Sequence, residues 1–103
     1  MTIKKYDQKL KLLRKQIDGL DRQIMMLLKN RFRIVVRIAT LKKKLNLEAY
    51  QPSRWKSMLK ERILKANKIG MHPRFAKLFF NLIHNESVRI QKSMRTKGTR
   101  NGK

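Results

Sequence analysis

The chain has 103 residues and a formal net charge of +22, from 28 Lys and Arg against 6 Asp and Glu. This length allows one domain at most, and the absence of Cys excludes disulfides and thiolate metal sites. No apolar run approaches the roughly 18 residues of a transmembrane helix, and the basic N-terminus is not followed by the apolar segment of a signal peptide. We therefore expect a cytoplasmic protein.

One long helix is predicted from about residue 10 to residue 45, with residues 1–9 beginning it. Its apolar residues recur in steps of three and four, the period of one helix face: Leu13, Ile17, Leu20, Ile24 and Leu27. At 1.5 Å per residue this helix would be about 50 Å long, too long to bury these residues against one short partner. We therefore expect a second copy of the chain to pack along this face, which we call the seam.

Two cations interrupt the seam. The same steps continued beyond Leu27 give Arg31, then Val35 and Ile38, then Lys42. Arg31 and Lys42 are eleven residues apart, about three turns, so they project from the same side. A buried cation without a partner is very unfavourable. Either this part of the seam is therefore exposed to solvent, or an anion lies between Arg31 and Lys42. The simpler alternative is chance, because 28 residues of the chain are cationic.

Two shorter helices are predicted after a connection at residues 46–51. Pro52 suits the first turn of a helix that runs to about Ile69, and Gly70 follows at the position of a left-handed cap. Pro73 then opens a third helix. No window alternates like a strand, so we predict an all-α fold with one long and two shorter helices.

The third helix is expected to end near Met94. We assign residues 1–94 to one helical domain and residues 95–103 to a basic, disordered tail, because the tail has no apolar periodicity.

Polar residues also lie on one ridge of this third helix. Phe79, Ile83, Ser87 and Gln91 are successive i+4 positions, so a hydroxyl and an amide follow two apolar residues on the same face. Spacing alone favours the simpler interpretation that the helix leaves the core near Glu86. The alternative is that Ser87 and Gln91 face a ligand.

Together these residues resemble the all-helical chorismate mutase family over about residues 10–94. The segments that carry the resemblance are LRKQIDGLDRQIMMLLKNR, Lys42, Pro52-Ser53-Arg54 and LFFNLIHNESVRIQ. The resemblance implies catalytic roles for Lys42 and Gln91 and substrate-binding roles for Arg14, Arg31, Arg54 and Ser87. It also implies an intertwined homodimer in which each of two sites draws Arg14 from one chain and the other residues from the second.

The activity that this resemblance implies is the rearrangement of chorismate to prephenate, on the route to phenylalanine and tyrosine. This intramolecular reaction needs no nucleophile, metal or cofactor, and we expect none. It needs a dicarboxylate held in a compact conformation, and the planar fork of Arg grips carboxylates bidentately. Negative charge grows on the ether oxygen as the C–O bond breaks, and by resemblance Lys42 and Gln91 donate to that oxygen.

Two positions depart from the family pattern. The family usually places Glu directly after the Arg of the second helix, where it helps to bind the ring hydroxyl, and here that residue is Trp55. An acidic residue is also common three positions before that Arg, and here it is Gln51. An amide can still bind a hydroxyl, whereas an indole can only donate, and a Trp on an apolar stripe also suits a core. Isochorismate or an amino analogue of chorismate therefore stay alternative substrates, although Ser87 and Gln91 favour chorismate.

The charge supports a different hypothesis, a basic nucleic-acid-binding helical protein that is unrelated to the family or an inactive member of it. A net charge of +22 predicts attraction to polyanions. The cations are spread along every segment, which favours non-specific binding over a dedicated nucleic-acid site.

Overall fold

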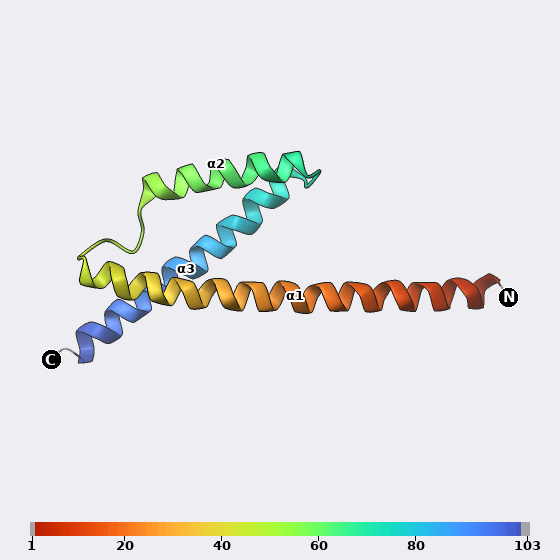
Figure 1. Cartoon of the computed structure of the whole chain (residues 1–103), viewed down its shortest axis with the longest axis horizontal. Helices are drawn as coiled ribbons and strands as arrows, with labels where there is room; N and C mark the ends of the chain where they lie inside the picture. The colour runs from red at the N-terminus through yellow and green to blue at the C-terminus, as the bar shows by residue number, and fades with distance from the viewer. Residues whose placement is uncertain (1, 102–103) are drawn as a thin grey trace. The chain divides into compact units, whose positions relative to one another are not determined.

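The computed structural model describes the backbone of residues 2–101 and the side chains of residues 3–95. Three helices follow one another: α1 (Thr2–Lys44), α2 (Pro52–Lys68) and α3 (Pro73–Asn101) (Figure 1). The prediction of an all-helical chain with one long and two shorter helices is confirmed. Within the described backbone, no helix is both long enough and apolar enough to span a bilayer.

Helix α1 has 43 residues, which corresponds to about 65 Å. Packing divides the chain within this helix into two units, Met1–Arg33 and Ile34–Lys103, and each is described by itself. The predicted seam residues of the first unit are all exposed in the single chain: Leu13, Ile17, Leu20, Ile24 and Leu27. Isolated helices owe little stability to propensity alone, so packing of this exposed face against an apolar surface would stabilise the stretch.

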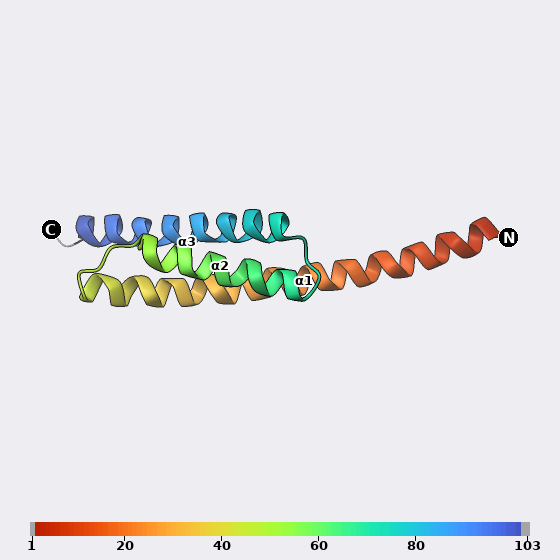
Figure 2. The ribbon, with the colours of Figure 1, turned by 90° about the horizontal axis from the view of Figure 1, so that it is seen from above.

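In the second unit α2 and α3 pack on each other, and the chain reverses direction between them (Figures 1 and 2). Gly70, with φ +81°, makes the reversal possible because this left-handed conformation carries little penalty for glycine. Met71 N–H donates to Ala66 O at 2.8 Å and Gly70 N–H to Asn67 O at 3.2 Å, the two bonds of a Schellman cap. The predicted cap at Gly70 is confirmed.

Both prolines open helices, as expected from their fixed φ and missing N–H. Pro52 is the first residue of α2, preceded by the extended residue Gln51, and Pro73 is the first of α3. His72 assists the second start, because its Nδ1 accepts a hydrogen bond from Arg74 N–H at 3.2 Å. This bond satisfies one of the N–H groups that a helix start leaves without an intrahelical partner.

Helix α3 continues to Asn101, beyond the end expected near Met94. The segment contains no proline, and Gly98 alone is too weak a signal to end a helix. The division into a domain of residues 1–94 and a disordered tail of residues 95–103 stays a prediction.

The apolar core of the single chain consists mostly of small side chains. Its buried members are Val35, Ala39, Ala49, Met58, Ala66, Ala76 and Ile83. Many large apolar side chains of all three helices are exposed instead, among them Leu64, Phe75 and Leu82. The described side chains therefore leave much of the apolar surface of the chain uncovered.

Candidate functional site

Lys42 lies where the chain turns out of α1. Its carbonyl oxygen accepts from Leu47 N–H at 2.8 Å while Asn46, with φ +56°, takes the left-handed position of the cap. This turn folds the connection back over the helix end, so that Lys42 Nζ donates to Ala49 O at 2.9 Å. The backbone carbonyl and the side-chain ammonium of Lys42 thus both bind the connection after α1.

Lys42 also reaches α3. Its Nζ donates to Gln91 Oε1 at 3.0 Å, and both residues are shielded, Gln91 being only 7% exposed. The predicted catalytic pair, 49 residues apart in the sequence, is therefore brought into direct contact. The Gln91 NH₂ group, which donates hydrogen bonds, is directed away from this contact by the bond that its oxygen makes.

The polar ridge of α3 stays buried. Ser87 is 6% exposed and Gln91 7%, like Ile83 one turn earlier at 6%. The interpretation that α3 leaves the core near Glu86 is therefore wrong; Lys42 of α1 contacts this ridge at Gln91. Ser87 Oγ donates to Ile83 O at 2.9 Å, which satisfies its hydroxyl proton and fixes the side chain along the helix.

The pKa of Lys42 is lowered, first by burial and then by the charges of Arg95 and Arg54. Burial disfavours the ammonium, and two guanidinium groups close enough to act on it add like-charge repulsion. A bound anion would relieve all three effects. Arg54 is itself exposed, so its predicted position beside the Lys42–Gln91 pair rests on this electrostatic interaction.

Arg95 and Glu48 belong to this region and were not identified from the sequence. Arg95 Nη1 lies 3.9 Å from Glu48 Oε2, and this weak ion pair links α3 to the connection after α1. Arg95 is four residues after Gln91, so it extends the ridge that begins at Phe79 by one more turn. That spacing was the available signal, but one Arg among 28 basic residues does not stand out.

Trp55 follows Arg54 on α2 and is half-buried. Its indole stacks on the imidazole of His84, with ring centroids 3.8 Å apart and planes at 14°. Tyr50 contacts the same imidazole edge-on at 5.5 Å. Neither the stack nor His84 was predicted, because no local pattern connects residues 29 positions apart.

The other two predicted residues, Arg14 and Arg31, lie in the first unit, Met1–Arg33. Arg14 is exposed and Arg31 half-buried in the single chain. The structure thus assembles the Lys42–Gln91 pair with Ser87 and Arg54 nearby, and the participation of Arg14 and Arg31 stays a prediction.

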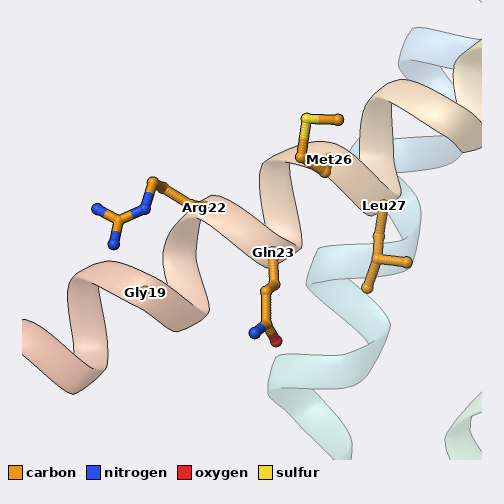
Figure 3. Close-up of a pocket in the computed structure, with 5 residues that line it drawn as sticks. All are labelled: Gly19, Arg22, Gln23, Met26 and Leu27. Atoms are coloured by element: carbon orange, nitrogen blue, oxygen red, sulfur yellow. The ribbon is translucent and has the colours of Figure 1, made fainter.

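The same unit carries a hollow on the surface of α1. It is lined by Gly19, Arg22, Gln23, Met26 and Leu27 (Figure 3). All five residues come from successive turns of one helix, and Figure 3 shows Met26 and Leu27 pointing to opposite sides of it. This hollow is an open depression on the surface of one helix, and none of the predicted site residues lines it. We therefore do not regard it as a ligand site.

Among the described residues, no group of three His, Cys, Asp or Glu side chains could hold a metal ion. The groups that converge on Gln91 are instead cations and amides, which suit an anionic ligand with several hydrogen-bond acceptors.

Comparison with known families identifies the family of the chain. A sequence model of the chorismate mutase type II family matches residues 13–92, most of the chain. The chain belongs to the chorismate mutase type II family. The resemblance inferred from the motifs is therefore confirmed, and the matched range includes all six predicted site residues.

A curated member of the family is similar to part of the chain. The bifunctional chorismate mutase/prephenate dehydratase of Aquifex aeolicus (strain VF5) is 41% identical over 61 residues, which is 59% of this chain. These residues cover 17% of the relative's length. The similarity therefore concerns a small part of a larger protein.

Proposed function

We propose that the chain catalyses the rearrangement of chorismate to prephenate, the step that leads to phenylalanine and tyrosine. The observation that supports this most is the part-buried hydrogen bond between Lys42 Nζ and Gln91 Oε1, 3.0 Å long, in a member of the chorismate mutase type II family. An ammonium and a primary amide meeting from two helices form a pair of donors for one developing oxyanion.

The geometry around Lys42 is suited to this task before any substrate binds. An ammonium has three donors, and two of those of Lys42 are taken by Ala49 O and Gln91 Oε1. The third proton and the Gln91 NH₂ group would donate to the ether oxygen of chorismate. Because both groups are already held in place, little reorganisation is needed as the C–O bond breaks.

The carboxylates of chorismate would be bound by Arg14, Arg31 and Arg54, with Ser87 in support. Each Arg presents a fixed fork that matches a carboxylate, so the substrate is held in the compact conformation from which it reacts. The lowered pKa of Lys42 fits an anionic ligand, since the repulsion from Arg54 and Arg95 is offset when a dicarboxylate binds between the cations.

The functional form would be an intertwined homodimer. The seam of α1 exposes Ile17 by 56% and Leu20 by 53% in the single chain. Burying a fully exposed side chain of this kind is worth about 1.5–3 kcal/mol, so covering the exposed half contributes roughly half as much for each residue. A second α1 running along the first would cover them. In this assembly each site takes Arg14 from one chain and the other five predicted residues from the second.

The direct test is the loss of chorismate absorbance with the purified protein, followed by identification of the product by mass spectrometry and NMR. Prephenate formation is expected with chorismate, with isochorismate and the amino analogue of chorismate reacting more slowly. Preferential turnover of either alternative would reassign the substrate, and an inert, folded dimer would refute the proposed activity.

One observation favours a second candidate function. The net charge of +22 would attract nucleic acids whatever the reaction catalysed. If this binding is incidental, it should be weak, insensitive to sequence and steeply salt-dependent. Tight, sequence-selective binding that survives moderate salt would instead identify the chain as a nucleic-acid-binding member of the family.

A further inference from the structure

An aromatic cluster lies beside the polar residues of the proposed site. The imidazole of His84 is held on two sides, by the stacked indole of Trp55 at 3.8 Å and by the edge of Tyr50 at 5.5 Å. Two rings, one from the connection and one from α2, therefore orient the imidazole of His84 on α3.

This cluster is next to the Lys42–Gln91 pair along two helices. Trp55 directly follows Arg54, one of the two cations, with Arg95, whose charges act on Lys42. His84 precedes Gln91 by seven residues, two helical turns, so the two side chains project from the same side of α3, about 10 Å apart along its axis. A ring-sized ligand that contacts Gln91 can therefore reach the imidazole.

A hollow of about 300 Å³ adjoins the cluster, with Tyr50, Trp55, His84 and Val88 among its walls. The aromatic and aliphatic walls suit the carbon face of a ring. Asn81, Asn85 and Lys92 line the same hollow, so it also offers two amides and one cation to a ligand.

The polar groups of chorismate are two carboxylates, one ether oxygen and one ring hydroxyl. The cations and Gln91 account for the carboxylates and the ether, so the ring hydroxyl needs a further hydrogen-bonding partner. An indole can only donate to it, whereas an imidazole nitrogen can donate or accept according to whether it carries a proton. His84, which stacks on Trp55, is therefore better suited to the hydroxyl than Trp55 is.

We propose that His84, oriented by Trp55 and Tyr50, binds the ring hydroxyl of the substrate and so determines specificity at the ring side of the site. This inference rests on the proposed function, because it needs a substrate with such a hydroxyl. His84 is a specificity-determining residue, and Trp55 and Tyr50 are positioning residues that act through it.

The test crosses a protein change with a substrate change. Wild type and His84→Phe, which keeps an aromatic ring on Trp55, are each assayed with chorismate and with an analogue that has hydrogen in place of the ring hydroxyl. We expect His84→Phe to lower kcat/KM for chorismate about tenfold, the typical effect of one hydrogen bond, and to leave kcat/KM for the analogue unchanged. Equal effects on both substrates, or none on either, would overturn the inference.

A second variant guards against simple misfolding. His84→Gln retains a donor and an acceptor and should recover most of the discrimination between chorismate and the analogue that His84→Phe loses. If His84→Gln discriminates as poorly as His84→Phe while both keep wild-type helicity and oligomeric state, His84 does not bind the hydroxyl.

A binding measurement separates this inference from the proposed function. Trp55 is the single Trp of the chain, so its fluorescence reports on the cluster directly. Titration with prephenate, which carries the ring hydroxyl, should change the emission saturably in wild type and bind about tenfold more weakly to His84→Phe. A protein without turnover that shows this difference would refute the activity and retain the ring-side site. Normal turnover with equal prephenate affinity in wild type and His84→Phe would support the activity and refute the role of His84.

Discussion

The two ends of helix α1 differ in what covers their apolar face. In the N-terminal unit Ile17 and Ile24 are 56% and 46% exposed, whereas Val35 and Ala39 near the C-terminal end are 6% and 4% exposed. Both pairs follow the helical period, so periodicity alone does not separate a face that one chain buries from a face that it leaves exposed. We therefore predict that the exposed N-terminal face of α1 serves assembly, while its C-terminal end holds Lys42 in the site.

The largest effect should come from charging the exposed seam. Ile24→Glu places a carboxylate where the second chain is expected, and an unpaired buried charge is very unfavourable. We predict loss of the dimer at micromolar concentration and turnover at background, measured by sedimentation equilibrium and chorismate loss. Met26→Glu, two residues and about 200° away on the helix, is the matched control and should keep both. A folded, active monomer of wild type would contradict the role of the seam.

Removing the central cation should have the next largest effect. Lys42→Ala deletes the donor held by Ala49 O and Gln91 Oε1. Loss of one such contact, made mainly in the transition state, typically lowers kcat by roughly 10²–10³, with KM changing less. Lys43→Ala removes an exposed cation from the same turn and should change kcat less than twofold. Comparable losses in the two variants would mean that net charge, not position, matters.

Gln91→Glu should make the activity dependent on acidic pH. Ionised, Glu would repel the developing oxyanion; protonated, it could donate as Gln does. The variant should therefore be active only towards low pH, whereas wild type should show no such requirement for acid because the amide of Gln91 does not titrate. An unchanged pH profile of kcat in Gln91→Glu would show that this side chain does not face the breaking bond.

The smallest effect should come from Arg95, which tunes the site without a proposed contact to substrate. Its charge helps to lower the pKa of Lys42, and activity needs the protonated ammonium, so wild-type activity should fall with rising pH below the ordinary Lys value of 10.5. Arg95→Gln removes one cause of the lowering, so the midpoint of this alkaline loss should move to higher pH.

Glu48→Gln is the control for the ion pair between Arg95 and Glu48, whose distance is 3.9 Å. This variant leaves the Arg95 charge in place, and exposed ion pairs contribute about 0–1 kcal/mol at most. Its alkaline midpoint should therefore not rise. An upward shift equal to that of Arg95→Gln would assign the effect to the geometry of the connection and not to the charge of Arg95.

The helices could be predicted because their signals are local. Pro52 and Pro73 open helices through their fixed φ, and Gly70 closes one through its left-handed conformation. The cap at Asn46 was missed, although Asn is a residue that tolerates positive φ. The end of α3 was placed too early because a basic segment without periodicity can still continue a helix.

The site was predictable only in part. Arg31 and Lys42 stood out because cations interrupt an apolar seam. Spacing alone, however, wrongly predicted that the ridge of α3 leaves the core near Glu86. Ser87 and Gln91 are buried because another element covers them, and that element is distant in the sequence. His84 could not be identified as a site residue from the sequence, because its role depends on contacts with the rings of Trp55 and Tyr50.

The sequence by itself determined the helices, their order, the family and the residue types available to the site, because propensities, caps and motif spacing act over a few residues. Tertiary structure alone decided that Lys42 and Gln91 meet across 49 residues, and that burial and two guanidinium groups lower the pKa of Lys42. It also decided that His84 lies flat on Trp55. Burial and hydrogen bonding depend on which surfaces cover each other, and no local pattern specifies that.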